Sequence, residues 1–343
     1  MAAQLTTRKP QGGLARGISA EVLQSVDSWL DISRTERRRR AVEALNLYDH
    51  ETIWDLVQAH VLLHGRSKGR TSPNTLKSYR VAMERLIGWA ANRGLKLHHT
   101  RGPEGHASEF VGPDEARRFV LDLQAKNYSP GTINQRLVGI RALYRALRWA
   151  GVVDEDPFDG LSVRDTAPQD RIEPIPERDL EKLLRKADAE ERALILLGSD
   201  AGLRISEVHG LRWGDLTLED PRPRVLVRNG KGDKTAETYL SERAADALVA
   251  IHPGLGDHAQ EPVFEYSQVW LNTMFRRACT RARLSKPYHF HQLRHRAAMV
   301  LLKATGNLTI VQRHLRHSSL RATEYYVGVL DEDLQDAVYK MPS

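Results

Sequence analysis

The chain has 343 residues, 41% of them hydrophobic, and a formal net charge of +7, which predicts two soluble domains rather than one core. Its single cysteine, Cys279, excludes an internal disulfide and a cysteine-built metal cluster, and it suits a reducing compartment. No apolar run approaches the roughly 18 residues of a membrane span, and the first residues lack the apolar core of a signal peptide, so a cytoplasmic protein without a membrane partner is expected. The positive charge favours a nucleic acid or another anionic surface as partner.

Residues 1–48 are predicted to form an N-terminal extension that is partly disordered and contains short helices. A helix is expected over 18–30, because Ser19 can cap its start and apolar residues recur on one face. The run RTERRRR then opens a second short helix that ends at Leu47. Its five arginines fit a DNA contact and a solvated helix start equally well.

Residues 49–161 are predicted to form a helical bundle with one basic side. Helices are expected over 52–63, from Ser72–Pro73 to Ile87, over 112–125, and from Ser129–Pro130 to Leu147. The second and fourth of these helices carry candidate contacts to DNA phosphates, which are Lys77, Arg80, Arg136, Arg141 and Arg145. An ordinary bundle with a solvated basic face is the alternative. A proline-rich stretch begins near Asp154 and leads into a predicted linker over 162–176.

Residues 177–343 are predicted to form a second domain, which makes the whole chain mainly α with a small β-hairpin, an α+β fold. A β-hairpin is expected between 222 and 240, where the apolar period changes to two around the turn signal Asn229-Gly230. Helices are expected over 177–187, 190–200, from 205, over 241–251, 269–282, 291–304, from 307, and over 331–339.

One stretch of this domain has a single sign of charge. From Tyr266 to Thr323 there is no Asp or Glu, but there are eleven Lys or Arg residues. Solvated helical faces normally mix both signs, so this stretch indicates a surface that binds a polyanion. Two adjacent tyrosines, Tyr325 and Tyr326, follow it. The stretch therefore predicts a phosphate-binding active site in which one of the two tyrosines is the nucleophile.

Three further patterns supply the groups that such a site needs. His291 and Arg294 share a helical face, and arginine binds a phosphodiester with two parallel bonds while histidine can donate or shuttle a proton. Arg204 follows a helix break and Glu207 stands where it could orient that arginine, although a surface ion pair is the alternative. Lys231 occupies a glycine-flanked hairpin turn, either as a mobile acid for a leaving oxygen or as a solvated tip.

The ordered set GLRISE, a GKGxK hairpin, HxxRH, and LxH followed nine residues later by tyrosine resembles the tyrosine recombinase family over roughly residues 50–335. The resemblance implies a two-domain DNA clamp, in which a helical core-binding domain precedes the catalytic domain. It implies a site-specific recombinase that exchanges DNA strands through a 3′-phosphotyrosine and a Holliday junction, for chromosome or plasmid dimer resolution or element integration. It implies neither a cofactor nor a metal.

Carried over onto this sequence, the resemblance assigns catalytic roles to Arg204, Lys231, His291, Arg294, His317 and the nucleophile Tyr326, with Glu207 and His295 in support. Tyr325 is one residue away from the nucleophile position and is expected to pack instead. His314 is expected to be structural. The family usually has glycine before the last histidine, whereas this chain has Arg316, a departure that bears on the local turn.

The resemblance also implies that double-stranded DNA is bound by a homo-tetramer on two sites, with the helix over 331–339 docked on the neighbouring protomer. A second recombinase or an accessory protein is a further candidate partner. Three other functions compete. A zinc hydrolase is disfavoured, because Gln292 replaces the glutamate of HExxH. A type IB topoisomerase shares the chemistry but reseals the same strand, and a DNA-binding protein without catalysis would be expected to have lost at least one polar residue of the set.

Overall fold

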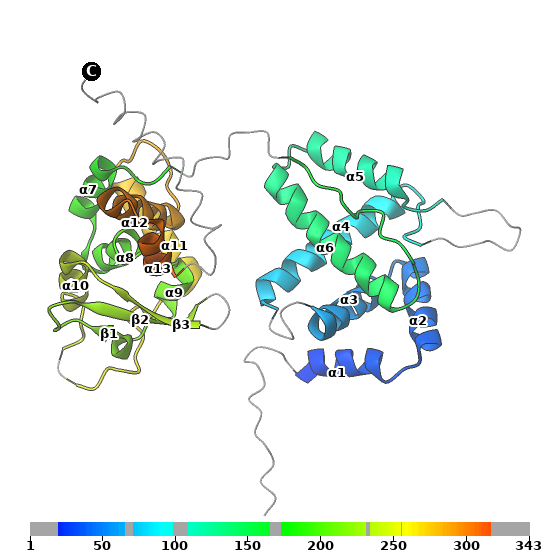
Figure 1. Cartoon of the computed structure of the whole chain (residues 1–343), viewed down its shortest axis with the longest axis horizontal. Coiled ribbons are helices and arrows are strands. Elements are labelled where there is room, and N and C mark those ends of the chain that lie inside the picture. Colours follow the sequence, from blue (N-terminus) through cyan, green and yellow to red (C-terminus); the bar gives the residue numbers. More distant parts are fainter. Residues whose placement is uncertain are drawn as a thin grey trace, which may run out of the picture. The chain divides into compact units, whose positions relative to one another are not determined.

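The computed structural model describes residues 20–65, 71–98, 109–164, 173–230, 234–254 and 256–316 (Figure 1). The chain divides into two compact units, residues 1–169 and 170–343. Several expectations lie outside the described residues, namely those for Lys231, His317, Tyr325, Tyr326 and the helix over 331–339. No helix among the described residues is long and apolar enough to cross a membrane.

The first unit is a bundle of helices, α1 (Ala20–Leu30), α2 (Arg34–Leu47), α3 (His50–His64), α4 (Pro73–Ala91), α5 (Pro113–Ala125) and α6 (Pro130–Trp149). Ser72 and Ser129 cap α4 and α6 with their side chains, each followed by a proline in the first turn, as the sequence predicts. Helices α4 and α6 cross closely at Gly139, where an added Cβ would lie 2.8 Å from Cβ of Ala82.

Helices α1 and α2 belong to the core of this bundle. The indole of Trp29 on α1 is wholly buried, and Leu45 on α2 is buried in the same apolar cluster as residues of α3 to α6. The sequence predicts that both helices belong to an N-terminal extension. In the structure they cover the bundle and are stabilised by its apolar surface.

The segment after α6 is anchored to the first unit. Phe158 is wholly buried in its core, and Asn134 exchanges two hydrogen bonds of 2.9 Å with the backbone of Val163. At the other end of the linker predicted over 162–176, Ile175 is buried in the core of the second unit. The described ends of that linker are therefore each held by one unit.

The second unit confirms the mainly helical α+β class. Its helices are α7 (Glu177–Lys186), α8 (Ala189–Ser199), α9 (Ile205–His209), α10 (Glu242–Val249), α11 (Gln268–Arg281), α12 (Phe290–Thr305) and α13 (Leu308–Leu315), with a 3-10 turn, η1 (Trp213–Asp215). The expected hairpin is β2 (Arg224–Gly230) and β3 (Lys234–Tyr239). A short strand, β1 (Leu216–Thr217), adds to β2 and completes an antiparallel sheet in the order β1-β2-β3, which lies below α8, α12 and α13 in Figure 1.

Helix α8 organises this unit, because it packs against α10, α11 and α12. Asp188 and Glu191 form a reciprocal capping box at its start, with bonds of 2.8 Å and 3.1 Å. Near its end, an added Cβ at Gly198 would lie 2.9 Å from Phe290 and 3.0 Å from Leu293, both on α12. This close approach brings the polar residues of α12 next to the loop between α8 and α9.

Candidate active site

Arg204 and Glu207 are positioned by the turn between α8 and α9. Gly202 in this turn has φ of +63°, and an added Cβ there would lie 2.6 Å from Leu315. The backbone N–H of Arg204 donates to Oε2 of Glu207 at 2.8 Å, and its Nη1 donates to Oε1 at 2.7 Å. The Arg204 side chain is 27% exposed and that of Glu207 only 5%. A buried carboxylate therefore orients an arginine that reaches the surface, and the pair is not an ordinary surface ion pair.

Arg294, on α12, connects two chain segments and lies close to the carboxylate of Glu207. Its Nη1 donates to the carbonyl of Gly202 and its Nη2 to the carbonyl of Leu315. Its Nη1 also lies 3.7 Å from Oε2 of Glu207, and its side chain is 2% exposed. A guanidinium so deeply buried needs a compensating negative charge, which Glu207 provides.

His291 stands one turn before Arg294 on α12. The protein packed around its ring, together with the charges of Arg294 and Arg204, lowers its pKa. Its edge packs against His295, with 4.7 Å between ring centroids. With its lowered pKa the imidazole is neutral at pH 7, so it can accept or donate a proton.

Arg316 also belongs to this cluster, although the sequence predicts for it only a place in a turn. Its Nη2 donates to Oε2 of Glu207 at 2.7 Å. Glu207 therefore lies within 4 Å of three guanidinium groups, those of Arg204, Arg294 and Arg316. Burial alone would raise the pKa of Glu207, but the charge of Arg316, the backbone N–H of Arg204 and the charges of Arg294 and Arg204 lower it overall. Arg316 and Glu207 are 109 positions apart, so no local spacing could have signalled the pair.

His314 links α13 to the sheet, which agrees with the structural role expected for it. Its Nε2 donates to the carbonyl of Asp200 at 3.0 Å, and its Nδ1 lies 3.0 Å from the hydroxyl of Thr238 on β3. Burial is the main cause of its lowered pKa. The hairpin that carries Lys231 is thereby tied to the end of α13.

The cluster contains the kinds of group that suit a phosphodiester. Two arginines, Arg204 and Arg294, converge on one carboxylate, with a neutral imidazole on the adjacent turn. Guanidinium groups held in place suit the charge that develops on the non-bridging oxygens of a phosphate under attack. Within the described ranges, no group of three His, Cys, Asp or Glu side chains is arranged to hold a metal ion.

The predicted DNA contacts of α4 and α6 fall into two kinds. Lys77 and Arg145 are exposed, although Nε of Arg145 also donates to the carbonyl of Arg141 at 3.1 Å. Arg141 itself donates from Nε to the carbonyl of Phe158 at 3.0 Å and from Nη2 to that of Leu161. Its guanidinium therefore anchors the segment after α6.

Arg80 and Arg136 are also engaged within the first unit. Arg80 forms ion pairs with Glu84, at 2.8 Å, and with Glu51. The guanidinium of Arg136 lies 3.7 Å from the ring centroid of Tyr128. A phosphate would have to replace these contacts, which lowers the net gain from binding there.

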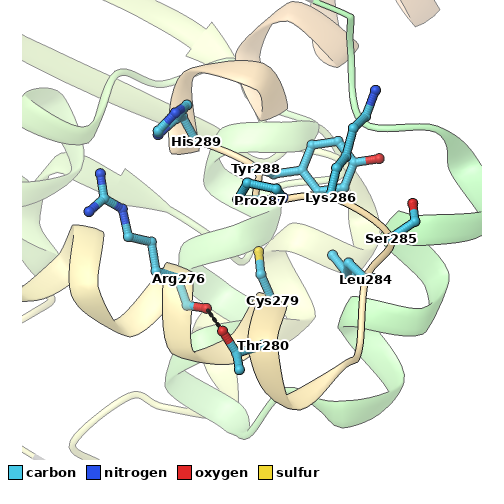
Figure 2. Close-up of a pocket in the computed structure, with 9 residues that line it drawn as sticks. All are labelled: Arg276, Cys279, Thr280, Leu284, Ser285, Lys286, Pro287, Tyr288 and His289. Atoms are coloured by element: carbon cyan, nitrogen blue, oxygen red, sulfur yellow. Dashed lines mark hydrogen bonds between the residues drawn. The ribbon is translucent and has the colours of Figure 1, made fainter.

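A pocket of about 590 Å³ is lined by residues outside the cluster (Figure 2). It is lined by the C-terminal half of α11 and by residues 284–289, which lead into α12. Cys279 borders it, and burial raises the pKa of this thiol to about 12, so the thiol is protonated and unreactive at pH 7. None of the expected catalytic residues lines this pocket.

Comparison with known proteins extends over both units. Residues 173–333 match the model of the phage integrase family. The chain is 30% identical over 278 residues to tyrosine recombinase XerC of Xanthomonas campestris pv. campestris (strain B100), covering 77% of this chain and 81% of that protein. It is 28% identical over 281 residues to tyrosine recombinase XerC of Pseudomonas fluorescens, covering 77% and 88%. The crystal structure of XerH site-specific recombinase bound to a palindromic difH substrate shares its fold, with a TM-score of 0.63 at 17% identity over 93% of this chain and 94% of that one.

Proposed function

This chain belongs to the phage integrase family of tyrosine recombinases and is a site-specific DNA recombinase, and we propose that it cleaves and rejoins double-stranded DNA through a 3′-phosphotyrosine on Tyr326. The observation that carries the proposal is the convergence of Arg204 and Arg294 on Glu207. These cations, with His291 beside them, supply the charge that a scissile phosphate requires.

The chemistry is an exchange of phosphoesters. The oxygen of Tyr326 attacks phosphorus, the bond from phosphorus to the 5′ oxygen breaks, and Lys231 gives its proton to that oxygen. A phenol with a pKa near 10 is mostly neutral at pH 7, so its proton passes to an acceptor such as His291. Arg204, Arg294 and His317 stabilise the phosphate. The free 5′-hydroxyl of the partner strand then attacks the phosphotyrosine, and no ATP is consumed.

The acid role of Lys231 has its own test. A 5′-bridging phosphorothiolate leaves as a thiolate and needs no proton. We therefore expect this substrate to restore cleavage by Lys231→Ala, and a lack of rescue would assign Lys231 to binding instead.

The exchange of strands requires an assembly. We infer a cyclic homo-tetramer on two duplexes that passes through a Holliday junction, with both units of each protomer bound to DNA. Residues 331–343 of one protomer dock on the next. The biological setting is chromosome or plasmid dimer resolution or the integration of an element. Deleting residues 331–343 is expected to preserve single-site binding and to abolish the two-duplex complex, and synapsis by the truncated chain would contradict the docking.

The test of the proposed nucleophile uses nicked duplexes whose binding site is first selected from a random library by the wild-type protein. Cleavage next to the nick releases a short fragment and traps the covalent protein–DNA adduct, which a denaturing gel detects. Tyr326→Phe is expected to form no adduct and to bind the site normally, whereas the matched variant Tyr325→Phe forms it. Adducts with Tyr326→Phe but not with Tyr325→Phe would move the nucleophile by one residue.

A further inference from the structure

Arg316 occupies a backbone position that favours glycine. It is the C-cap of α13 and has φ of +56°, in the left-handed region. A side chain with a Cβ is strained in this conformation, whereas glycine adopts it freely. The arginine side chain at this strained position is only 7% exposed. A buried cation at a strained position indicates a function beyond closing the turn.

The contacts of Arg316 restrict the rotation of the Glu207 carboxylate. Oε2 of Glu207 accepts from Nη2 of Arg316 at 2.7 Å and from the backbone N–H of Arg204 at 2.8 Å. Oε1 is thereby left to accept from Nη1 of Arg204 at 2.7 Å. Arg316 thus holds one oxygen of the carboxylate while the other directs the Arg204 side chain.

Arg316 also connects the carboxylate to the sheet. Its Nη1 donates to the carbonyl of His314 at 2.9 Å, and the hydroxyl of Thr238 on β3 donates to the same carbonyl at 3.2 Å. The guanidinium therefore links Glu207 on α9 to the end of α13, whose His314 carbonyl is shared with Thr238 on β3.

We propose that Arg316 is a positioning residue for recombination, which fixes Glu207 in the orientation that directs Arg204 at the scissile phosphate. The inference rests on the proposed function, because it takes Arg204 as a phosphate ligand. Without Arg316, Oε2 of Glu207 keeps only the backbone N–H of Arg204 as its hydrogen-bond donor, so the carboxylate is held less firmly and the direction of the partly exposed Arg204 side chain is less well fixed. A displacement of about 1 Å at a reacting group can lower a rate about a hundredfold.

Charge gives a second, independent signature. The charged and titratable groups that face Glu207 are Arg204 before α9, Arg294 and His291 on α12, and Arg316 after α13. Arg316 supplies the strongest of the charges that lower the pKa of Glu207 against the effect of burial. Removing it raises that pKa, so Glu207 takes up a proton at a higher pH. In a plot of cleavage rate against pH, the fall of the rate on the acid side then moves to higher pH.

The experiment measures single-turnover cleavage of the nicked substrate at saturating DNA, across pH, for Arg316→Met, Arg316→Gly and Arg316→Lys. We expect Arg316→Met to lower the rate at least about tenfold and to shift the fall of the rate on the acid side to higher pH, with the Kd for DNA within about twofold of wild type. Arg316→Lys restores part of the rate, because an ammonium can still pair with Glu207. The matched control, Arg185→Met, removes an exposed arginine from α7, outside the basic stretch from Tyr266 to Thr323, and leaves the rate unchanged.

Arg316→Gly distinguishes the effect of the left-handed backbone conformation from the effect of the side-chain charge. Glycine relieves the left-handed backbone, so a merely structural arginine predicts wild-type cleavage from this variant, whereas positioning predicts slow cleavage by a folded protein. Should Arg316→Met melt below the assay temperature, Arg316→Gly carries the test. Wild-type rates and pH profiles in the Arg316 variants would overturn this inference alone, provided that Arg204→Ala abolishes cleavage. Cleavage by Arg204→Ala would overturn the proposed site itself.

Discussion

Arg141 in the first unit and Arg294 in the second make the same kind of contact but have different roles. Each guanidinium donates to two backbone carbonyls, those of Phe158 and Leu161 for Arg141 and those of Gly202 and Leu315 for Arg294. Arg294 also lies 3.7 Å from the buried carboxylate of Glu207, which pairs with a second, partly exposed arginine, Arg204. An arginine that joins chain segments therefore becomes a candidate for catalysis when a buried anion gathers further cations around it.

The largest expected effect separates these two arginines. We expect Arg294→Ala to lower the single-turnover cleavage rate at least about a hundredfold, the scale for losing one preorganised charge donor. Because the buried Glu207 loses a partner, the free energy of unfolding should also fall by about 3 kcal/mol. The measurements are cleavage of the nicked substrate and chemical denaturation.

Arg141→Ala is the matched variant in the first unit. It should lower the free energy of unfolding by about 2 kcal/mol, because two hydrogen bonds from a charged donor are lost. Its cleavage rate at saturating DNA should equal that of wild type. An equal loss of cleavage rate in Arg141→Ala and Arg294→Ala would show that the position of Arg294 beside Glu207 gives it no special role in catalysis.

His60 in the first unit and His291 in the second allow the two units to be compared in their dependence on pH. Burial, followed by the charges of His64 and Arg145, lowers the pKa of His60 in the first unit to about 4. Its unfolded value is near 6.5, so the unfolded chain binds the proton more tightly. His60 therefore contributes at most about 3 kcal/mol to the free energy of unfolding. This contribution is fully present above pH 6.5 and is lost as the pH falls towards 4. His291 shifts in the same direction, but its titration should appear in the cleavage rate.

Denaturation of the first unit across this pH range checks the expectation for His60. In His60→Gln the slope of stability against pH should flatten, whereas in His291→Gln it should be retained. An unchanged slope in His60→Gln would show that other groups control acid unfolding.

The sequence predicted the fold and the family well, because those signals are local. Serine followed by proline marked the starts of α4 and α6, and the change of period marked the hairpin of β2 and β3. The α+β class and the identification as a tyrosine recombinase are confirmed. The two-residue strand β1 is too short to show a period, so it was missed.

What the sequence could not reveal depends on contacts between distant segments. Arg80, Arg136 and Arg141 carry the same charge as Lys77 and Arg145, and only their partners in the folded bundle distinguish them. The same holds for Arg316, whose carboxylate partner is 109 positions away. Residue type and spacing could place cations near DNA, but they could not show which cations were already paired.

The smallest expected effects concern the exposed cations of the first unit. Lys77→Gln and Arg145→Gln should each weaken DNA binding several-fold and reduce the salt dependence, expressed as log K against log salt concentration, by about one unit. Arg80→Gln should change that slope little, because its guanidinium already pairs with two carboxylates. A larger change of slope in Arg80→Gln than in Lys77→Gln would reverse the assignment.

The most direct test of the account concerns the carboxylate on which the cations converge. Glu207→Gln keeps the shape of the side chain and removes its charge, and its rate of covalent adduct formation is to be measured at saturating DNA, beside its melting temperature. We expect a folded protein that binds its site and forms the adduct at least about tenfold more slowly, because the arginines lose the anion that holds them at the phosphate. Adduct formation at the wild-type rate by a folded Glu207→Gln protein would contradict the account.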